Sequence, residues 1–174
     1  MLNLVRMESP GLAVLAIHRL LDNLTPDNIT YAITKLPEVF DVHELDTQAT
    51  LMAQLETRRG KSPAIGLYTA DDKHRLLIPH STTPSQLDVT LVQETLIKEM
   101  FQVETLADHI SYTAYADDAV AHVKSGTGRV ALLMNPTPVE QVLEVAMAGS
   151  IMPQKSTYFY PKMATGLVLN LLNR

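Results

Sequence analysis

The chain has 174 residues, no cysteine and a formal net charge of −5 at pH 7, with 46% hydrophobic and 19% charged residues. This composition is that of a folded globular protein, and the length suits a single domain, residues 1–174, with a sizeable core. The missing cysteines exclude disulfides and thiolate metal sites, and the acidic balance argues against nucleic-acid binding. No apolar run approaches the roughly 20 residues of a membrane helix, and the start lacks a signal peptide, so we expect a cytoplasmic protein without a membrane partner.

The first half of the chain predicts strands and helices in alternation. Thr25 and Pro26 supply an N-cap and a first-turn proline for a helix that Pro37 closes. A second helix ends at Gly60, and the polar residues 70–73 form the turn of a hairpin. The predicted strands are residues 2–7, 12–17, 39–45, 64–69 and 74–78, and the predicted helices are residues 26–36 and 47–59.

The second half predicts helices that each follow a polar start signal. Residues 85–88 (SQLD) resemble a capping box, and residues 137–140 (TPVE) combine an N-cap threonine, a proline and a reciprocal glutamate. The predicted helices are residues 85–100, 117–125 and 137–148, and the predicted strands are residues 109–115, 129–134, 156–160 and 166–172. Hairpins among crossovers predict an α+β fold, in which about five helices pack on a mixed sheet within a single layered domain.

Six histidines raise the question of a metal site, but their spacing does not support one. His74 and His80 share the parity of one strand, yet six residues at about 3.3 Å each separate them by roughly 20 Å. No H-x-x-x-H, H-x-H or H-E-x-x-H pattern occurs. We therefore expect no metal site. His18 is a candidate for a different kind of site, because the adjacent Arg19 could bind an anion.

The most unusual stretch of the chain is residues 152–162 (MPQKSTYFYPK), which holds three of the nine aromatic residues, two lysines and two prolines. It lies in the only extended basic segment, because no acidic residue follows Glu144. As a strand it would carry Lys155 and Lys162 on opposite faces. Two interpretations remain: residues 155–157 bind an anion, or the tyrosines bury their rings at a sheet edge while the lysines reach solvent. Spacing alone favours the second.

This stretch, followed by residues 165–168 (TGLV), resembles the C-terminal signature of a bacterial and archaeal family called domain of unknown function 1015. Residues 7–12 (MESPGL) running into 18–20 (HRL), and residues 132–137 (LLMNPT), agree with the same family. Family members are considerably longer, and their N-terminal half carries a D-G-H-H-R motif that resembles the nucleotide-contacting motif of ParB-like, sulfiredoxin-like and free-serine kinase proteins. That motif is absent here. The resemblance implies that this chain is the C-terminal portion, either an expressed fragment or the product of a split gene.

Two hypotheses about function follow from the resemblance and the residues together. The first is the C-terminal half of a nucleotide-dependent phosphotransferase that acts on a small anionic molecule; it would need the missing half for its nucleotide and would be inactive alone. Its catalytic residues are unknown, and its expected substrate- and anion-binding residues are Lys155, Ser156, Thr157, Tyr158, Tyr160, Lys162, His18 and Arg19. We rank residues 155–157 above Lys162 as the anion ligands. The second hypothesis is a non-catalytic interaction domain that docks on the missing half or on a second copy of itself.

Overall fold

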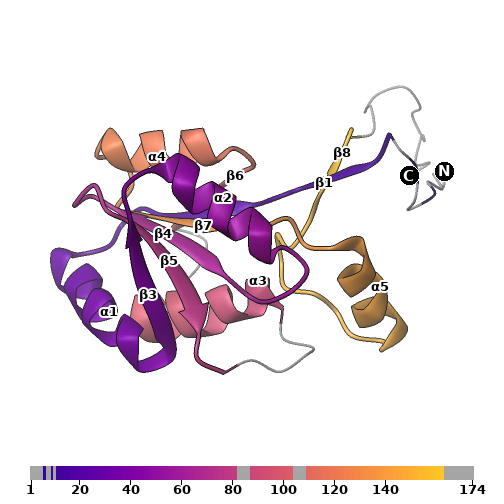
Figure 1. The fold of residues 1–174 in the computed structure, drawn as a ribbon, viewed down its shortest axis with the longest axis horizontal. Helices are drawn as coiled ribbons and strands as arrows, with labels where there is room; N and C mark the ends of the chain where they lie inside the picture. The colour runs from indigo at the N-terminus through magenta and orange to yellow at the C-terminus, as the bar shows by residue number, and fades with distance from the viewer. Residues whose placement is uncertain (1–5, 7–8, 10, 82–86, 104–108, 163–174) are drawn as a thin grey trace, which may run out of the picture.

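A computed structural model describes residues 6, 9, 11–81, 87–103 and 109–162 (Figure 1). Its strands are β1 (Ala13–Leu15), β2 (His18–Leu21), β3 (Phe40–Leu45), β4 (Ile65–Thr69), β5 (His74–Pro79), β6 (Ile110–Thr113), β7 (Val130–Met134) and β8 (Tyr158–Tyr160). Its helices are α1 (Pro26–Val39), α2 (Gln48–Arg58), α3 (Asp88–Leu91) running directly into the π-helix η1 (Val92–Met100), α4 (Ala116–Lys124) and α5 (Val139–Met147). The strand expected at 166–172, and all of that expected at 2–7 except Arg6, lie outside the described residues.

The α+β class is confirmed, but the expected mixed sheet is wrong: the six-stranded sheet, ordered β3-β5-β4-β7-β2-β6, is antiparallel at every pairing. The crossovers β3–α2–β4 and β6–α4–β7 do connect strands that run in the same direction. In each case another strand lies between the two, β5 in the first crossover and β2 in the second. These are split βαβ units, in which parallel strands are never hydrogen-bonded neighbours.

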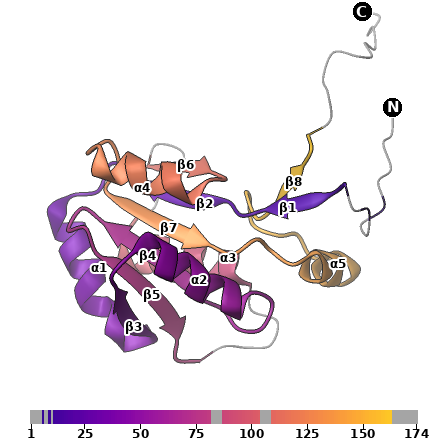
Figure 2. The same cartoon turned by 45° about the horizontal axis from the view of Figure 1, so that its top comes forward.

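Helices cover both faces of this sheet (Figures 1 and 2). Along β7, Val130, Leu132 and Met134 belong to the core under α1 and η1, whereas Ala131 and Leu133 belong to the core under α2 and α4. This alternation is the two-residue period of a strand buried on both faces. None of the described helices is long and apolar enough to cross a membrane.

Two of the predicted helix starts are confirmed. The Thr25 hydroxyl accepts a hydrogen bond from the N–H of Asn28 at 3.2 Å, and the Asn28 side chain accepts the Thr25 N–H in return. Thr47 caps α2 in the same way by accepting the Thr50 N–H at 3.1 Å. Pro37 does not close α1, which continues to Val39, because a proline in the last turn removes only one N–H from the helix.

The N-cap predicted at Thr137 is not formed: Pro138 stands at the N-cap position of α5, and this helix has no side-chain cap there. Of the capping box predicted at residues 85–88, residues 85 and 86 lie outside the described residues, and Leu87 stands at the N-cap position of α3. The Thr137 hydroxyl donates instead to the carbonyl oxygen of Ser156 at 2.8 Å. The threonine therefore ties the start of α5 to the tail stretch, a tertiary contact that local sequence does not specify.

Outside the main sheet, β1 and β8 form a two-stranded antiparallel ribbon, with Ala13 opposite Tyr160 and Leu15 opposite Tyr158. The ribbon and α5 lie to one side of the six-stranded sheet (Figure 1). No residue of β1, β8 or α5 is buried. The expected strand 156–160 is thus shorter than predicted and pairs with the N-terminal strand, not with the main sheet.

Candidate functional site

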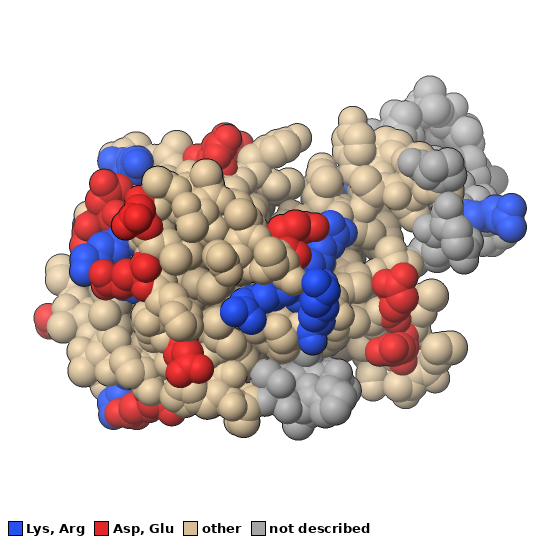
Figure 3. Space-filling view, in the orientation of Figure 1, with Lys and Arg blue, Asp and Glu red and all other residues tan. Residues whose placement is uncertain are grey.

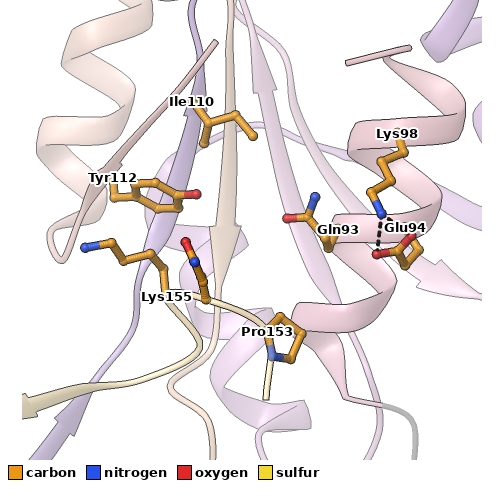
Figure 4. Close-up of a pocket in the computed structure, with 8 residues that line it drawn as sticks. Gln93, Glu94, Lys98, Ile110, Tyr112, Pro153 and Lys155 are labelled. Atoms are coloured by element: carbon orange, nitrogen blue, oxygen red, sulfur yellow. Dashed lines mark hydrogen bonds and ion pairs between the residues drawn. The ribbon is translucent and has the colours of Figure 1, made fainter. Parts of the chain in front are cut away.

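A pocket of about 450 Å³ lies between η1, β6 and the stretch that precedes β8 (Figure 4). Its volume is within the range of small-molecule sites. Ile110 and Pro153 contribute apolar surface, and the other lining residues carry amides, a phenol and charges. The lining residues are Gln93, Glu94, Lys98, Ile110, Tyr112, Pro153, Gln154 and Lys155.

The wall formed by η1 contributes one buried amide and one ion pair. Val92 and Leu96 bury the apolar side of the helix in the core under the sheet. Gln93 is also buried, and its Nε2 has no hydrogen-bond partner. Lys98 and Glu94 form an i,i+4 ion pair, with Lys98 Nζ 2.6 Å from Glu94 Oε2. Since π-helical segments often occur at functional sites, this wall is a candidate ligand-binding element.

Lys155 stands at the opposite rim of the pocket. It has a positive φ of 58°, and its exposed side chain places Nζ 5.8 Å from the centre of the Tyr112 ring. Figure 4 shows the lysine extended across the face of this ring. This distance is near the limit of about 6 Å for a cation–π contact, so the ring attracts the ammonium weakly and does not neutralise its charge. Lys155 therefore remains free to attract an anion.

Arg19 lies next to Tyr112, because the two residues face each other in the pairing of β2 with β6. Its side chain is only 1% exposed. Nη1 donates to the sulfur of Met134 at 2.6 Å, while Nε and Nη2 have no partner. Burial lowers the pKa of Arg19, and the nearby Tyr112 phenol partly opposes this effect. A guanidinium nevertheless keeps its charge in proteins, so a buried cation without a carboxylate partner among the described residues lies beside the pocket.

His18, the other member of the predicted pair, points to the opposite face of the sheet because consecutive residues of a strand alternate. Its Nδ1 accepts the backbone N–H of Met134 at 3.1 Å. Burial lowers the pKa of His18 to about 4, so the ring is neutral at pH 7. His18 and Arg19 therefore do not converge on one anion, as the sequence had suggested.

The remaining tail residues do not gather around the pocket. The Ser156 hydroxyl donates to the carbonyl oxygen of Pro153, so it closes a turn. Lys162 lies 4.3 Å from the centre of the Tyr158 ring on the ribbon, and Tyr160 follows on the same strand. Thr157 is half-buried between the turn and the ribbon. Of the expected tail residues, Lys155 is the one that lines the pocket.

Sequence reasoning missed the contributions of η1 and β6 to this pocket. Gln93 gave a usable signal, because it is a polar residue next to the buried positions Val92, Leu96 and Ile97 of one helix. Tyr112 gave none, since an aromatic residue in a strand is ordinary. In the sequence, Glu94 and Lys98 have the i,i+4 spacing of an ordinary surface ion pair and gave no signal of a pocket.

Comparison with known proteins identifies the class of fold. The sequence matches no protein-family model and no curated protein. A conserved hypothetical protein from Pyrococcus furiosus has a similar structure, with a TM-score of 0.55 and 17% identity over 89% of this chain and 59% of that chain. Free serine kinase in complex with AMP is similar at a TM-score of 0.55 and 11% identity, over 89% of this chain and 56% of the kinase chain. A point mutant of free serine kinase in complex with ADP gives a TM-score of 0.51 at 15% identity, over 89% of this chain and 56% of that chain.

At these identities the likeness shows the fold alone. The chain has the α+β fold of a part of free serine kinase, and it spans between half and three fifths of the length of the structures that it matches.

Proposed function

We propose that this chain is part of a nucleotide-dependent phosphotransferase that acts on a small molecule, and that it contributes the anion-binding pocket. The observation that carries the proposal is the Lys155 ammonium at the rim of the pocket, which has no ion pair among the described residues. The pocket residue Tyr112 also faces the buried Arg19, which has no ion pair within the described ranges either. The fold likeness to nucleotide complexes of free serine kinase supports it. So does the resemblance of residues 152–162 to the family called domain of unknown function 1015, to which we assign the chain as part of this proposal.

The charges around the pocket suit phosphate chemistry. Phosphoryl transfer depends mainly on positioning and on stabilising negative charge, which cationic side chains provide. Lys98 already has a carboxylate partner in Glu94, whereas the one contact of the Lys155 ammonium within the described residues is with an aromatic ring. Lys155 is therefore the rim cation available to a phosphate. The catalytic base and further nucleotide contacts would come from the portion of the matched folds that this chain does not span, so we expect binding without turnover.

Thermal unfolding in the presence of AMP, ADP or inorganic phosphate tests this function. A ligand present at 100 times its Kd should stabilise the folded chain by about 2.7 kcal/mol. For a protein of this size this raises the melting temperature by roughly 5–10 °C. Lys155→Gln should remove most of the rise, because it removes the rim charge. Lys162→Gln is the matched control, since Lys162 belongs to the same tail and also lies over a tyrosine ring, but outside the pocket. A wild-type melting curve unchanged by AMP and ADP, or equal loss in both variants, would contradict the proposal.

A second candidate, an assembly function, is favoured by the unburied apolar surface of the ribbon and α5. Met147 and Ile151 are 80% and 94% exposed, and Leu143 is 43% exposed. Figure 3 shows acidic side chains amid uncharged surface over α5. Among the described residues β1 and β8 pair only with each other, and a two-stranded ribbon is marginally stable in water. Open strand edges next to exposed apolar side chains are suited to binding another polypeptide, here a second copy of the chain.

A further inference from the structure

Three buried hydrogen-bond donors have no partner within the described residues: one belongs to Gln93, which lines the pocket, and two belong to Arg19, which faces the lining residue Tyr112. They are Nε and Nη2 of Arg19 and Nε2 of Gln93. The two side chains are 1% and 8% exposed, so water does not readily satisfy them. Native proteins pair the great majority of buried polar groups, and an unpaired one is destabilising by about 1–3 kcal/mol, or more if it is charged. Because all three atoms are donors, the missing partner is an acceptor.

The two free nitrogens of Arg19 define the shape of that acceptor. Nη1 is occupied by the sulfur of Met134, which leaves Nε and Nη2 on one edge of the planar guanidinium. This edge donates two parallel N–H groups, and it matches two oxygens of one carboxylate or phosphate. A single neutral acceptor would leave one donor and the positive charge unmatched.

Tyr112 relates both side chains to the pocket. Arg19 faces Tyr112 across the pairing of β2 with β6, and Gln93 lines the pocket with Tyr112. Figure 4 shows Gln93 and Tyr112 on opposite walls of the pocket, with their polar groups turned toward the space between them. The carboxylate on this wall, Glu94, is paired with Lys98. In the described part of the chain no ion pair includes Arg19, and an anionic ligand would supply the matching negative charge.

We infer that Arg19, through the side of the pocket that Tyr112 forms, and Gln93 on the facing wall make an oxyanion-binding site, which takes the carboxylate or phosphate group of a small molecule while Lys155 attracts it at the rim. The inference deepens the proposed function and rests on it for the pocket, but not for the nucleotide. It also explains why an arginine is placed in the sheet where an apolar residue would pack without an unpaired charge.

The test measures the affinity of the full chain for inorganic phosphate and for acetate, by the shift of the melting temperature with anion concentration. Stabilisation by both anions identifies a general oxyanion site, and stabilisation by one alone identifies the phosphate or the carboxylate as its ligand. Arg19→Met removes the charge and keeps a long side chain beside Met134. We expect it to weaken anion binding on the order of 10- to 100-fold, as loss of charged hydrogen bonds does, and to leave the anion-free melting temperature unchanged or higher.

Gln93→Leu provides a second variant that leaves Arg19 in place, and it should weaken anion binding by a smaller factor of about 5–10. Arg129→Met is the matched control, because Arg129 is an exposed arginine immediately before β7. An Arg19→Met protein that melts lower than wild type and keeps its response to both anions would overturn the inference, and so would a wild type that neither anion stabilises.

These outcomes differ from those that test the nucleotide. A nucleotide response that requires Lys155 but survives Arg19→Met would overturn the oxyanion site and leave the proposed function standing. An anion response that requires Arg19, without any response to AMP or ADP, would support the site and contradict the nucleotide-dependent function.

Discussion

His18 and Asp88 titrate in the same pH range and affect the stability of the fold in opposite directions. Burial lowers the pKa of His18 from 6.5 to about 4. Its neutral ring accepts the Met134 N–H through Nδ1, and protonation would remove this acceptor. Between pH 6.5 and 4 the unfolded chain binds the proton first, so the contribution of His18 is full above pH 6.5 and is lost as the pH falls. The difference between the two pKa values corresponds to about 3 kcal/mol.

Asp88, at the start of α3, behaves in the opposite way. Burial raises its pKa from 3.8 to about 6. The folded state therefore holds the proton between these values while the unfolded state has lost it, and stability falls as the pH rises from about 4 to 6. The effect is at most about 3 kcal/mol, and it is smaller to the extent that water reaches the half-buried carboxyl.

Because the two effects oppose each other, the wild type should show a nearly flat stability profile between pH 4 and 6.5. Asp88→Asn should expose the His18 titration, so that the free energy of unfolding falls by about 2–3 kcal/mol between pH 6.5 and 4. His18→Gln should give a slope of the opposite sign. Urea unfolding at half-unit pH steps measures both profiles.

Two other groups have shifted pKa values. The pKa of His74 is also lowered by burial, which adds to the His18 direction and gives the wild type a slight loss of stability toward pH 4, whereas the pKa of Asp71 lies at about 2, below the window. An Asp88→Asn profile as flat as that of the wild type would refute the reasoning, because no opposing titration would then have been uncovered.

Two further perturbations test the packing and the assembly surface. Gly66→Ala would place a methyl group 3.0 Å from Cβ of Leu133 and 3.1 Å from Leu51, and it should lower the free energy of unfolding by about 1–3 kcal/mol. Gly11→Ala is the control, because its nearest contact is 3.9 Å away, and it should not lower stability. Equal melting temperatures of the two variants would show that α2 does not pack tightly against β4 at Gly66. If the ribbon and α5 bind a second copy, sedimentation analysis should find a dimer that Ile151→Lys dissociates, and a monomeric wild type would exclude self-association.

The sequence predicted most elements well where local signals agree with tertiary packing. Thr25 and Thr47 cap their helices as their positions indicate, and the polar residues 70–73 separate β4 from β5. For these elements the capping residues, the turn residues and the spacing of hydrophobic residues were sufficient for the prediction. The antiparallel order of the sheet was not predictable in this way. The helix-connected pairs β3–β4 and β6–β7 would be parallel neighbours, but β5 lies between the first pair and β2 between the second.

The pocket was predictable only in part, and for a similar reason. Lys155 could be proposed from composition and family resemblance, and it does line the pocket. In the sequence, His18 and Arg19 have the appearance of the polar end of a strand. In the structure both are buried, and because side chains alternate along β2 they lie on opposite faces of the sheet. Their burial depends on β6 and β7, which follow roughly 90 and 110 residues later in the chain.

The most direct test of the central claim is a calorimetric titration of ADP into the wild type, Lys155→Gln and Lys162→Gln. The proposed function predicts saturable binding to the wild type and to Lys162→Gln, and binding weakened at least tenfold in Lys155→Gln, since one charged contact accounts for about 1.5–3 kcal/mol. Equal affinities for all three proteins, or no heat of binding to the wild type, would contradict it.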